Sequence, residues 1–174
     1  WSSRAACPSA EPAARSSPWQ ASAVQREIQA VFAETLVPSV SDWPIGTVGV
    51  IDESGFAKKG TASVGVGRQY CGRLGKVDNC QVGVFLVGVT PAGTALLDQQ
   101  LYLPKDWAKD KERRQQCSVP KNITFRTKPQ LGIDLLRRTR ANGLVTFDWI
   151  IADEAYGDNG ALLDALEADK QRYL

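Results

Sequence analysis

The chain has 174 residues, of which 43% are hydrophobic, with 21 Lys and Arg against 19 Asp and Glu and neither histidine nor methionine. A chain of this length can bury a core of its own, which excludes the small scaffolds that need disulfides or metals for stability. The absence of histidine excludes imidazole general bases and histidine-ligated metals, and the net charge of +2 is too small to indicate a nucleic-acid partner by itself.

Two features of the sequence bear on the compartment of the protein. The four cysteines contain no C-x-x-C pair, so neither a zinc ribbon nor a thioredoxin-like motif is predicted, and we expect thiols at Cys7, Cys71, Cys80 and Cys117. The longest apolar run, residues 82–89, is far shorter than the roughly 20 residues of a membrane helix, and no apolar stretch follows Arg4 to form a signal peptide. We therefore expect a cytoplasmic protein with no membrane partner.

The first 44 residues show two patterns in succession. Residues 1–18 are Ala, Ser and Pro with scattered Arg, a composition that favours disorder, and the start at Trp1 without methionine suggests a fragment. From Ala21 the apolar residues recur at three and four positions, which predicts a helix that ends before Pro38 and packs through Val24, Ile28, Val31, Phe32 and Leu36. Residues 19–44 are thus expected to form a docking helix and a loop.

The next part of the chain alternates between strand patterns and a basic segment. Residues 47–51 form a short β-branched strand that places Asp52 at its C-terminal end. Residues 55–79 are glycine-rich and predict an exposed, turn-rich segment with five basic residues: Lys58, Lys59, Arg68, Arg73 and Lys76. Two apolar strands at 80–90 and 94–103 flank a turn and predict a hairpin.

The last third of the chain adds helices and one more strand. Helices are predicted at 104–116 and 129–142, the second with Leu131, Leu135 and Leu136 facing inward and Arg137, Arg138 and Arg140 facing outward. A strand at 147–152 presents Asp153 at its end, a helix follows at 159–170, and another strand begins at Arg172. This order predicts an α/β fold with a mixed sheet and crossover helices.

Asp52 and Asp153 are the candidate catalytic and metal-binding residues. Each acid follows a predicted strand, and folding of one sheet could bring the two together. Oxygen-only ligation suits Mg²⁺ or Mn²⁺, and two such ions roughly 4 Å apart can clamp a phosphoryl transfer without any histidine. The alternative is that both are turn or helix-capping residues, which is the commoner role of Asp at a strand end.

The basic segment also allows two interpretations. A run of exposed charge is usually a solvated loop, whereas Lys58, Lys59, Arg68, Arg73 and Lys76 could instead hold a DNA backbone. The glycines do not form a phosphate-binding loop, because Tyr70 and Val77 occupy positions that a P-loop needs for glycine and for serine or threonine. A dinucleotide-binding fingerprint fails at Tyr70 as well.

A longer set of residues resembles the DDE transposases of bacterial insertion sequences, and most closely insertion-sequence family seven-oh-one. The resemblance covers residues 19–174, and the run from Asp52 to Phe85 is its most specific part. It rests on Val50-Ile51-Asp52-Glu53-Ser54-Gly55-Phe56, Lys58-Lys59-Gly60, Ser63-Val64-Gly65-Val66, Arg68-Gln69-Tyr70, Asp78-Asn79-Cys80-Gln81, and Ala152-Asp153-Glu154 with Tyr156-Gly157.

The resemblance implies a ribonuclease-H-like fold, incomplete at the C-terminus, over residues 45–174. By motif match Asp52 is the first acid and Asp153 the second, and the third, normally Glu, belongs beyond a fifth strand that is only beginning at Leu174. None of the available glutamates takes its place. The implied reaction is cleavage and strand transfer of DNA with two Mg²⁺ or Mn²⁺ ions, by a DNA-bound, nucleoid-associated protein that could act as a homodimer on transposon ends and target DNA.

Two other functions stay open at this point. Without the third acid, the chain alone is expected to bind DNA but to cleave little, so an inactive DNA-binding remnant of a decayed element is the main alternative. A sugar- or nucleotide-binding α/β domain that uses strand ends without metal is the second. For Lys58, Lys59, Arg68, Gln69 and Tyr70, the resemblance allows either DNA contact or a role in anchoring loops and packing.

Overall fold

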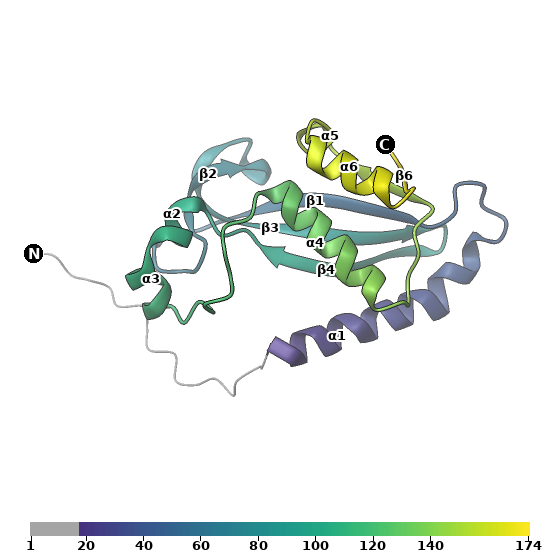
Figure 1. Ribbon diagram of the computed structural model, residues 1–174, viewed down its shortest axis with the longest axis horizontal. Coiled ribbons are helices and arrows are strands. Elements are labelled where there is room, and N and C mark those ends of the chain that lie inside the picture. The colour runs from purple at the N-terminus through teal and green to yellow at the C-terminus, as the bar shows by residue number, and fades with distance from the viewer. Residues whose placement is uncertain (1–17) are drawn as a thin grey trace, which may run out of the picture. The chain divides into compact units, whose positions relative to one another are not determined.

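The computed structural model describes residues 18–174, with side chains from Ala23 onward (Figure 1). The described chain divides into two compact units. One comprises Ser54–Gly83 and Leu101–Arg126, and the other comprises residues 18–53, Val84–Gln100 and Thr127–Leu174. We call them the first and the second unit. The expected disorder of residues 1–18 lies outside the described residues, except at Pro18, where the first helix begins.

The second unit contains most of the secondary structure. Its helical elements are α1 (Pro18–Val31), which continues as a π-helical turn (Phe32–Leu36) and a 3₁₀ turn (Val37–Val40), α4 (Lys128–Ala141), α5 (Glu154–Gly157) and α6 (Gly160–Ala168). Its strands are β4 (Gly93–Leu101), β5 (Trp149–Ala152), β6 (Arg172–Tyr173) and parts of two long strands, β1 (Val48–Ala57) and β3 (Lys76–Thr90). The predicted hairpin is therefore present as β3 and β4.

The strands of the second unit form a mixed sheet. Strand β1 lies between β3 and β5, β6 lies outside β5, and β4 pairs with β3. The pairs β1–β5 and β5–β6 are parallel, whereas β2 and β3 of the first unit are antiparallel. Because parallel neighbours need crossover connections, helices stand between them in the sequence. The α/β fold with a mixed sheet and crossover helices is confirmed, and it is consistent with a ribonuclease-H-like fold.

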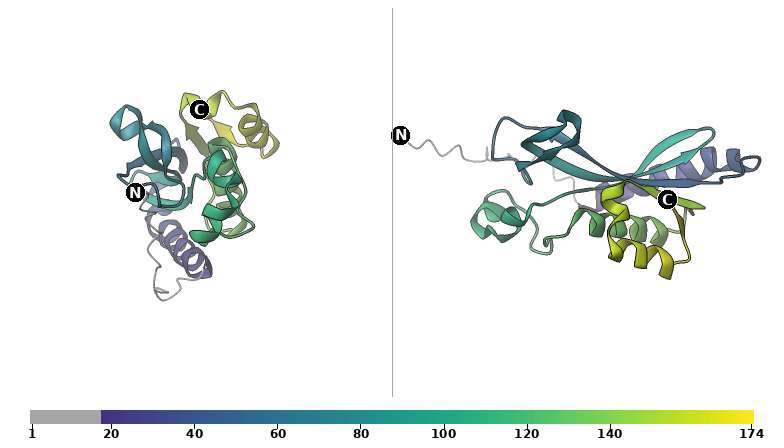
Figure 2. Two further views of the ribbon diagram at one scale, coloured as in Figure 1. Left: turned by 90° about the vertical axis from the view of Figure 1, so that its left-hand side faces the viewer. Right: turned by 90° about the horizontal axis from the view of Figure 1, so that it is seen from above.

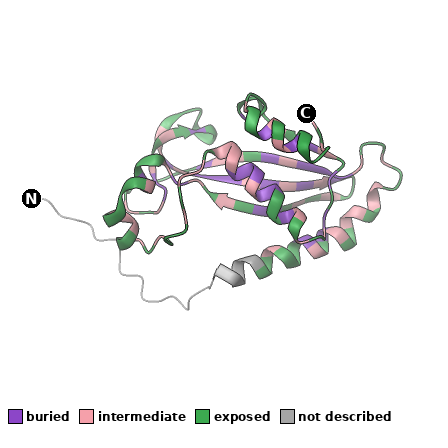
Figure 3. Ribbon diagram, viewed as in Figure 1, coloured by how far each residue is buried: buried purple, intermediate pink, exposed green. Residues whose placement is uncertain are grey.

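Helices α4 and α6 cover the same face of this sheet (Figure 2). The predicted inward residues of α4, Leu131, Leu135 and Leu136, are indeed buried, as are Ile51 of β1 and Ile150 of β5. Figure 3 shows the buried stripe of α4 and its exposed outer side. This apolar layer fixes the positions of β1 and β5, the two strands that lead to the candidate acids.

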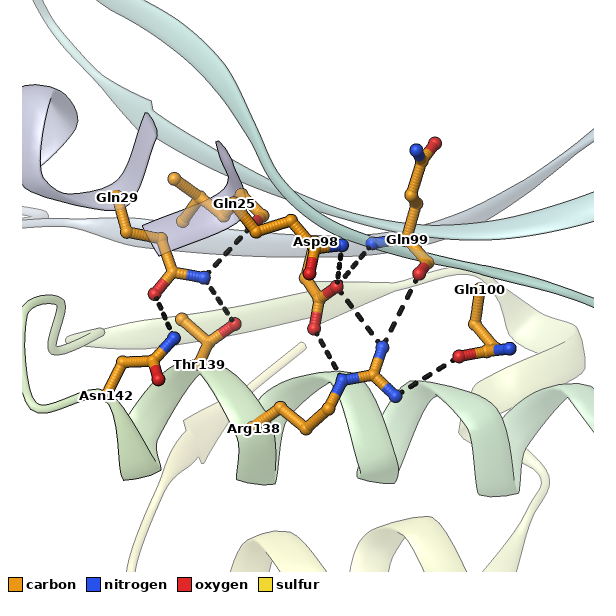
Figure 4. A network of polar contacts seen from close by, with 9 residues as sticks. Gln25, Gln29, Asp98, Gln99, Gln100, Arg138, Thr139 and Asn142 are labelled. Atoms are coloured by element: carbon orange, nitrogen blue, oxygen red, sulfur yellow. Dashed lines mark hydrogen bonds and ion pairs between the residues drawn. The ribbon is translucent and has the colours of Figure 1, made fainter. Parts of the chain in front are cut away.

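Helix α1 packs differently from the prediction. Val24, Ile28 and Val31, expected in the buried face, are 60%, 38% and 51% exposed, whereas Gln29 is 1% exposed. The Gln29 amide donates to the Leu97 carbonyl at 3.0 Å and its oxygen accepts from the Asn142 amide at 2.9 Å (Figure 4). Phe32, by contrast, is buried as predicted. A buried amide with its hydrogen bonds made is tolerated in a core, so a polar contact at Gln29 adds to the apolar one at Phe32.

Two arginines of α4 form polar contacts that the sequence did not indicate. Asp98 of β4 is 2% exposed, and its carboxylate accepts from Arg138 Nε at 2.9 Å and from the Gln25 amide at 2.7 Å (Figure 4). Arg140 forms an ion pair with Asp169. Arg137 is exposed, as predicted. Arg138 is also exposed, as predicted, but it pairs with Asp98 because a buried carboxylate requires a partner, and Arg140 is half-buried.

The first unit folds around a tryptophan. Trp107 is 1% exposed, packs with Val66 and Leu103, and donates its ring N–H to the Val66 carbonyl at 2.6 Å. It lies in α2 (Lys105–Lys109), which α3 (Lys111–Gln116) follows. The single helix predicted at 104–116 is wrong, because Asp110 interrupts it and accepts from the Arg113 backbone N–H at 2.9 Å as the N-cap of α3.

The basic segment of the first unit is more regular than predicted. Residues 55–79 include the end of β1, strand β2 (Gly67–Cys71), a 3₁₀ turn (Gly72–Leu74) and the start of β3. The prediction of a turn-rich segment is therefore wrong for its strands. Alternating exposed and buried positions in β2 mark a strand with one covered face, and the glycines concealed that pattern in the sequence.

Three of the four cysteines lie among the described residues. Cys71, Cys80 and Cys117 are thiols rather than disulfide partners, as expected, and Cys7 lies outside the described residues. Within residues 18–174, no group of three or more His, Cys, Asp or Glu side chains is placed to hold a metal. The same residues include no helix that is long and apolar enough to cross a membrane.

The N-terminus of α4 offers a test of the fold. The Thr127 hydroxyl accepts from the Gln130 backbone N–H, while the Gln130 side chain accepts from the Thr127 N–H at 3.0 Å, which is a capping box. Thr127→Ala is expected to lower the free energy of unfolding by about 1 kcal/mol. Chemical denaturation measures this change, and Thr146→Ala, an exposed threonine outside any helix, serves as the control. Equal stability of both variants would contradict the capping role.

Candidate functional site

The two candidate acids are neighbours in the sheet. The parallel register of β1 and β5 sets Val50 opposite Ile151 and Ile51 opposite Ala152. Asp52 follows Ile51 in β1, and Asp153 follows Ala152 at the end of β5. Both acids are exposed. The expectation that Asp52 ends its strand is wrong, because β1 continues to Ala57. Its pairing with β5 nevertheless ends there, which is the feature that brings the acids together.

Each acid is held by a local hydrogen bond. Asp153 is the N-cap of α5, and its carboxylate accepts from the Tyr156 backbone N–H at 3.3 Å. The Asp52 carboxylate accepts from the Glu53 backbone N–H at 2.6 Å. Within the described residues neither carboxylate forms an ion pair. Asp153 therefore has the capping role of the alternative interpretation, but both acids keep carboxylate oxygens for another ligand.

A three-residue group beside the acids engages Glu53. The Tyr156 hydroxyl donates to one Glu53 carboxylate oxygen at 2.8 Å, and Lys128 forms an ion pair with the other oxygen. We call Glu53, Lys128 and Tyr156 the brace. Tyr156 contacts both acid-bearing segments, since its backbone N–H reaches Asp153 and its hydroxyl reaches the residue after Asp52. The brace thus links β1, the segment that follows β5, and the start of α4.

The electrostatics of the brace follow from burial and negative charge. Tyr156 is 1% exposed, and burial raises the pKa of its hydroxyl far above the usual range, with Glu53 adding to the effect. The charges of Asp153 and Asp52 raise this pKa further, in that order. The phenol therefore stays protonated and remains a hydrogen-bond donor to Glu53.

Close packing positions the brace against the sheet. A Cβ atom at Gly132 of α4 would lie 3.0 Å from Ile51 Cγ2 and 3.5 Å from the Tyr156 ring. A larger residue would displace the helix or the two side chains, because both are fully buried. Glycine at this position lets α4 approach β1, with Lys128 in the first turn of the helix.

The five predicted DNA-contacting residues all lie in the first unit. Lys58 and Lys59 follow β1, Arg68 is in β2, and Arg73 is in the 3₁₀ turn, all four exposed and without an ion pair among the described residues. Lys76 instead pairs with Asp78 at 3.0 Å. The Asn79 N–H and Lys76 lower the pKa of the Asp78 carboxyl, so this pair persists near neutral pH.

The sequence alone did not decide the roles of Gln69 and Tyr70, two further residues of the first unit. Gln69 anchors the segment, because its amide donates to the carbonyls of Cys80 at 2.9 Å and Gly65 at 3.3 Å. Tyr70 is 57% exposed and does not belong to the core. The anchoring role therefore applies to Gln69, while Tyr70 stays available for contact with a partner.

Comparison with known proteins supplies the family. The sequence matches the family model described as DDE superfamily endonuclease over residues 13–174. This chain belongs to the DDE superfamily endonucleases. It is also 30% identical over 144 residues to the probable transposase for insertion sequence element IS701 of Microchaete diplosiphon, an alignment that covers 83% of this chain and 33% of that protein. No solved structure matches the chain.

These matches confirm the resemblance to a DDE-type insertion-sequence transposase. DDE superfamily endonucleases generally use divalent metals, and a transposase family implies a DNA partner. The chain spans about a third of the length of the curated relative that it matches.

Sequence reasoning missed two members of the brace in this DDE endonuclease chain. Tyr156 stands in the matched string after Asp153, but its hydrogen bond to Glu53 depends on the pairing of β1 with β5. Lys128 had no signal beyond its place near the start of a predicted helix. Both contacts join residues that are distant in the sequence, so a local pattern could not indicate them.

Proposed function

We propose that this chain supplies two acids, Asp52 and Asp153, of the metal-dependent site with which a DDE transposase cleaves and rejoins DNA. The observation that carries this proposal is the parallel register that sets the two acids side by side. Residues 45–174 would form part of the catalytic domain and residues 19–44 a docking segment. The intact protein would act on transposon ends and target DNA, as a homodimer if the ends are paired.

The donor set of the acid pair fits Mg²⁺ or Mn²⁺. Carboxylate oxygens suit these hard ions, and Mg²⁺ in particular is often held by one or two carboxylates together with substrate phosphates and water. When bound, two such ions would activate the attacking oxygen and stabilise the leaving oxygen.

The neighbouring side chains support this assignment through charge. Glu53 has both carboxylate oxygens engaged by Lys128 and Tyr156, so it is not available as a metal ligand in this arrangement. Lys128 neutralises Glu53 and thereby reduces the repulsion that a third negative charge would exert on DNA phosphate. Asp52 and Asp153, unlike Glu53, keep carboxylate oxygens that could bind a metal ion.

The basic residues of the first unit supply the second part of the proposal. Lys58, Lys59, Arg68 and Arg73 are exposed and unpaired among the described residues, which suits contact with phosphates. Lys76 would contribute less, because Asp78 already offsets its charge. These contacts carry no sequence information, so they would position DNA rather than select its sequence.

The main alternative is a DNA-binding chain without catalytic activity. One observation favours it, namely that among residues 18–174 no third carboxylate gathers with Asp52 and Asp153. The two functions differ in what Mg²⁺ should do to DNA binding. In a metal site shared with phosphate, Mg²⁺ strengthens binding, whereas it only competes for phosphates when no such site exists.

Measurement of DNA affinity with Mg²⁺ and with EDTA tests the proposal. We expect Mg²⁺ to raise the affinity of the wild-type chain for a duplex at constant ionic strength, and Asp52→Asn to lose this increase. In EDTA, Asp52→Asn should bind at least as well as wild type, because removal of the charge reduces repulsion. Asp164→Asn, an exposed acid on α6, is the control. An equal Mg²⁺ response in wild type and Asp52→Asn would favour the inactive alternative.

A further inference from the structure

One face of the β2–β3 hairpin exposes apolar side chains between cations. The antiparallel register sets Tyr70 opposite Val77 and Arg68 opposite Asn79, and residues directly opposite one another lie on the same face. Tyr70 is 57% exposed and Val77 50%. Leu74, in the turn between the strands, is 45% exposed. Isolated exposed apolar residues are common, but here two are direct cross-strand neighbours and the third lies in the connecting turn.

The other face of the hairpin is anchored within the first unit. Cys71 and Cys80 are fully buried and pack with Val82, while the Gln69 amide bonds to the backbone on the same side. At the connecting turn, a Cβ atom at Gly72 or Gly75 would meet no atom within 4 Å. On the Tyr70 face, Asn79 donates to the Lys58 and Gly60 carbonyls at the end away from the turn, whereas the turn itself has open space around it.

The charges beside this face indicate the partner. Arg68 lies in the same strand and on the same face as Tyr70, and Arg73 precedes Leu74; neither forms an ion pair among the described residues. Asp78, the acid of the hairpin, points to the opposite face and is paired with Lys76. An aromatic ring with one arginine on its face and another in the connecting turn suits a nucleic acid, in which bases stack on the ring and phosphates bind the guanidinium groups.

A second copy of the chain suits this face less well. A two-fold dimer would place the same patch against itself and bring Arg68 and Arg73 close to their equivalents. Such like-charge contacts oppose association. The cations favour a polyanion over self-association.

We infer that Tyr70, Val77 and Leu74 form a stacking surface for unpaired DNA bases, with Arg68 and Arg73 on the adjacent phosphates. The inference rests on the proposed function in that it takes DNA as the partner, and it specifies which DNA. In a duplex the flat faces of the bases are buried in the stack, so a stacking surface can use only overhangs, gaps or melted base steps. The hairpin therefore selects DNA whose bases are exposed.

Fluorescence anisotropy with three probes of one sequence tests the inference: a blunt duplex, the same duplex with a single-stranded overhang, and the single strand. Loss of one stacked base weakens binding by about 5- to 150-fold. We expect Tyr70→Ser to reduce affinity for the overhang and the single strand by about tenfold or more and to leave the blunt duplex unchanged. Tyr70→Phe should bind as wild type, because it keeps the ring.

The arginines and a matched control separate stacking from charge. Arg68→Gln with Arg73→Gln should weaken all three probes and reduce the dependence of affinity on salt, because both contacts release counterions. Leu96→Ser removes an apolar side chain of similar exposure from β4 and should change nothing. Circular dichroism shows whether each variant is folded.

Two results would overturn the inference. Equal affinity of wild type and Tyr70→Ser for the overhang probe would show that the ring does not stack on bases. Self-association in sedimentation experiments that Tyr70→Ser abolishes would assign the face to a second copy. Failure of the proposed function has another signature, an equal response of DNA affinity to Mg²⁺ in wild type and Asp52→Asn, which leaves the effect of Tyr70→Ser on the overhang probe unchanged.

Discussion

Tyr156→Ala is expected to lower the free energy of unfolding by about 3–5 kcal/mol, the range for removal of a large buried ring. The ring is 1% exposed, and its removal would also leave one Glu53 oxygen without its donor. Tyr156→Phe removes only the hydroxyl that donates to Glu53. It should lower the free energy of unfolding by about 1–3 kcal/mol, the penalty for a partly buried charged group that loses a hydrogen bond. Chemical denaturation measures both changes.

Tyr173→Phe is the matched control for the hydroxyl. The Tyr173 hydroxyl donates to Glu167 at 3.0 Å, but this contact is exposed, so its loss should cost less than about 0.5 kcal/mol. If Tyr156→Phe were as stable as Tyr173→Phe, the bond to Glu53 would contribute nothing to stability and the brace would have no role in the fold.

The pH dependence of stability offers a second view of the same hydroxyl. The pKa of Tyr156 is raised in the folded protein, above the value of about 10 that an unfolded tyrosine has. Above about pH 10 the folded state therefore keeps the Tyr156 hydroxyl proton, whereas the unfolded state releases it. Its stabilising effect is complete below about pH 10 and is lost as pH rises further. Between pH 9 and pH 11 the stability of wild type should fall more steeply than that of Tyr156→Phe.

Arg138→Met is expected to lower the free energy of unfolding by about 2–3 kcal/mol, the upper range for hydrogen bonds to a charged group. The Asp98 side chain is 2% exposed, and Arg138 donates to both of its carboxylate oxygens, at 2.9 and 3.2 Å. Loss of the guanidinium leaves a buried carboxylate with too few partners. The Arg138 side chain is 45% exposed, which keeps the effect below that of a fully buried pair.

Arg137→Met, the neighbouring position of α4, provides the control. Arg137 is exposed and forms no ion pair among the described residues, so its replacement should change stability by less than about 0.5 kcal/mol. In a double-mutant cycle, Asp98→Leu should remove most of the cost of Arg138→Met. Equal costs for the two arginines, or no coupling with Asp98, would show that the buried carboxylate does not need Arg138.

The fold class and the acid pair could be predicted from the sequence. Strand patterns end at or near Asp52 and Asp153, and crossover helices imply a sheet in which parallel strands end on the same side. The motif around Asp52 is long enough to indicate the family, which the family match confirms. Whether the acids serve as metal ligands stays a prediction that the Mg²⁺ experiment tests.

The partners of polar residues could not be predicted. The spacing of Val24, Ile28 and Val31 correctly indicated a helix, but these three residues are exposed. Gln29 is buried because the Leu97 carbonyl and the Asn142 amide lie within hydrogen-bond distance of its side chain. Arg138 lies at the surface, as its position in α4 indicated, but its pairing with the buried Asp98 could not be predicted. In both cases the deciding partner is far away in the sequence, and hydrophobic periodicity carries no information about it.

The close approach at Gly132 has a consequence for how relatives of this chain can diverge. A side chain at this position needs space that Ile51 and the Tyr156 ring now occupy. A methyl group there would require Ile51 to shift slightly, and a side chain larger than alanine would require more space from Ile51 and Tyr156. A relative with a large residue at position 132 should therefore carry a smaller residue at position 51, where the contact is tightest.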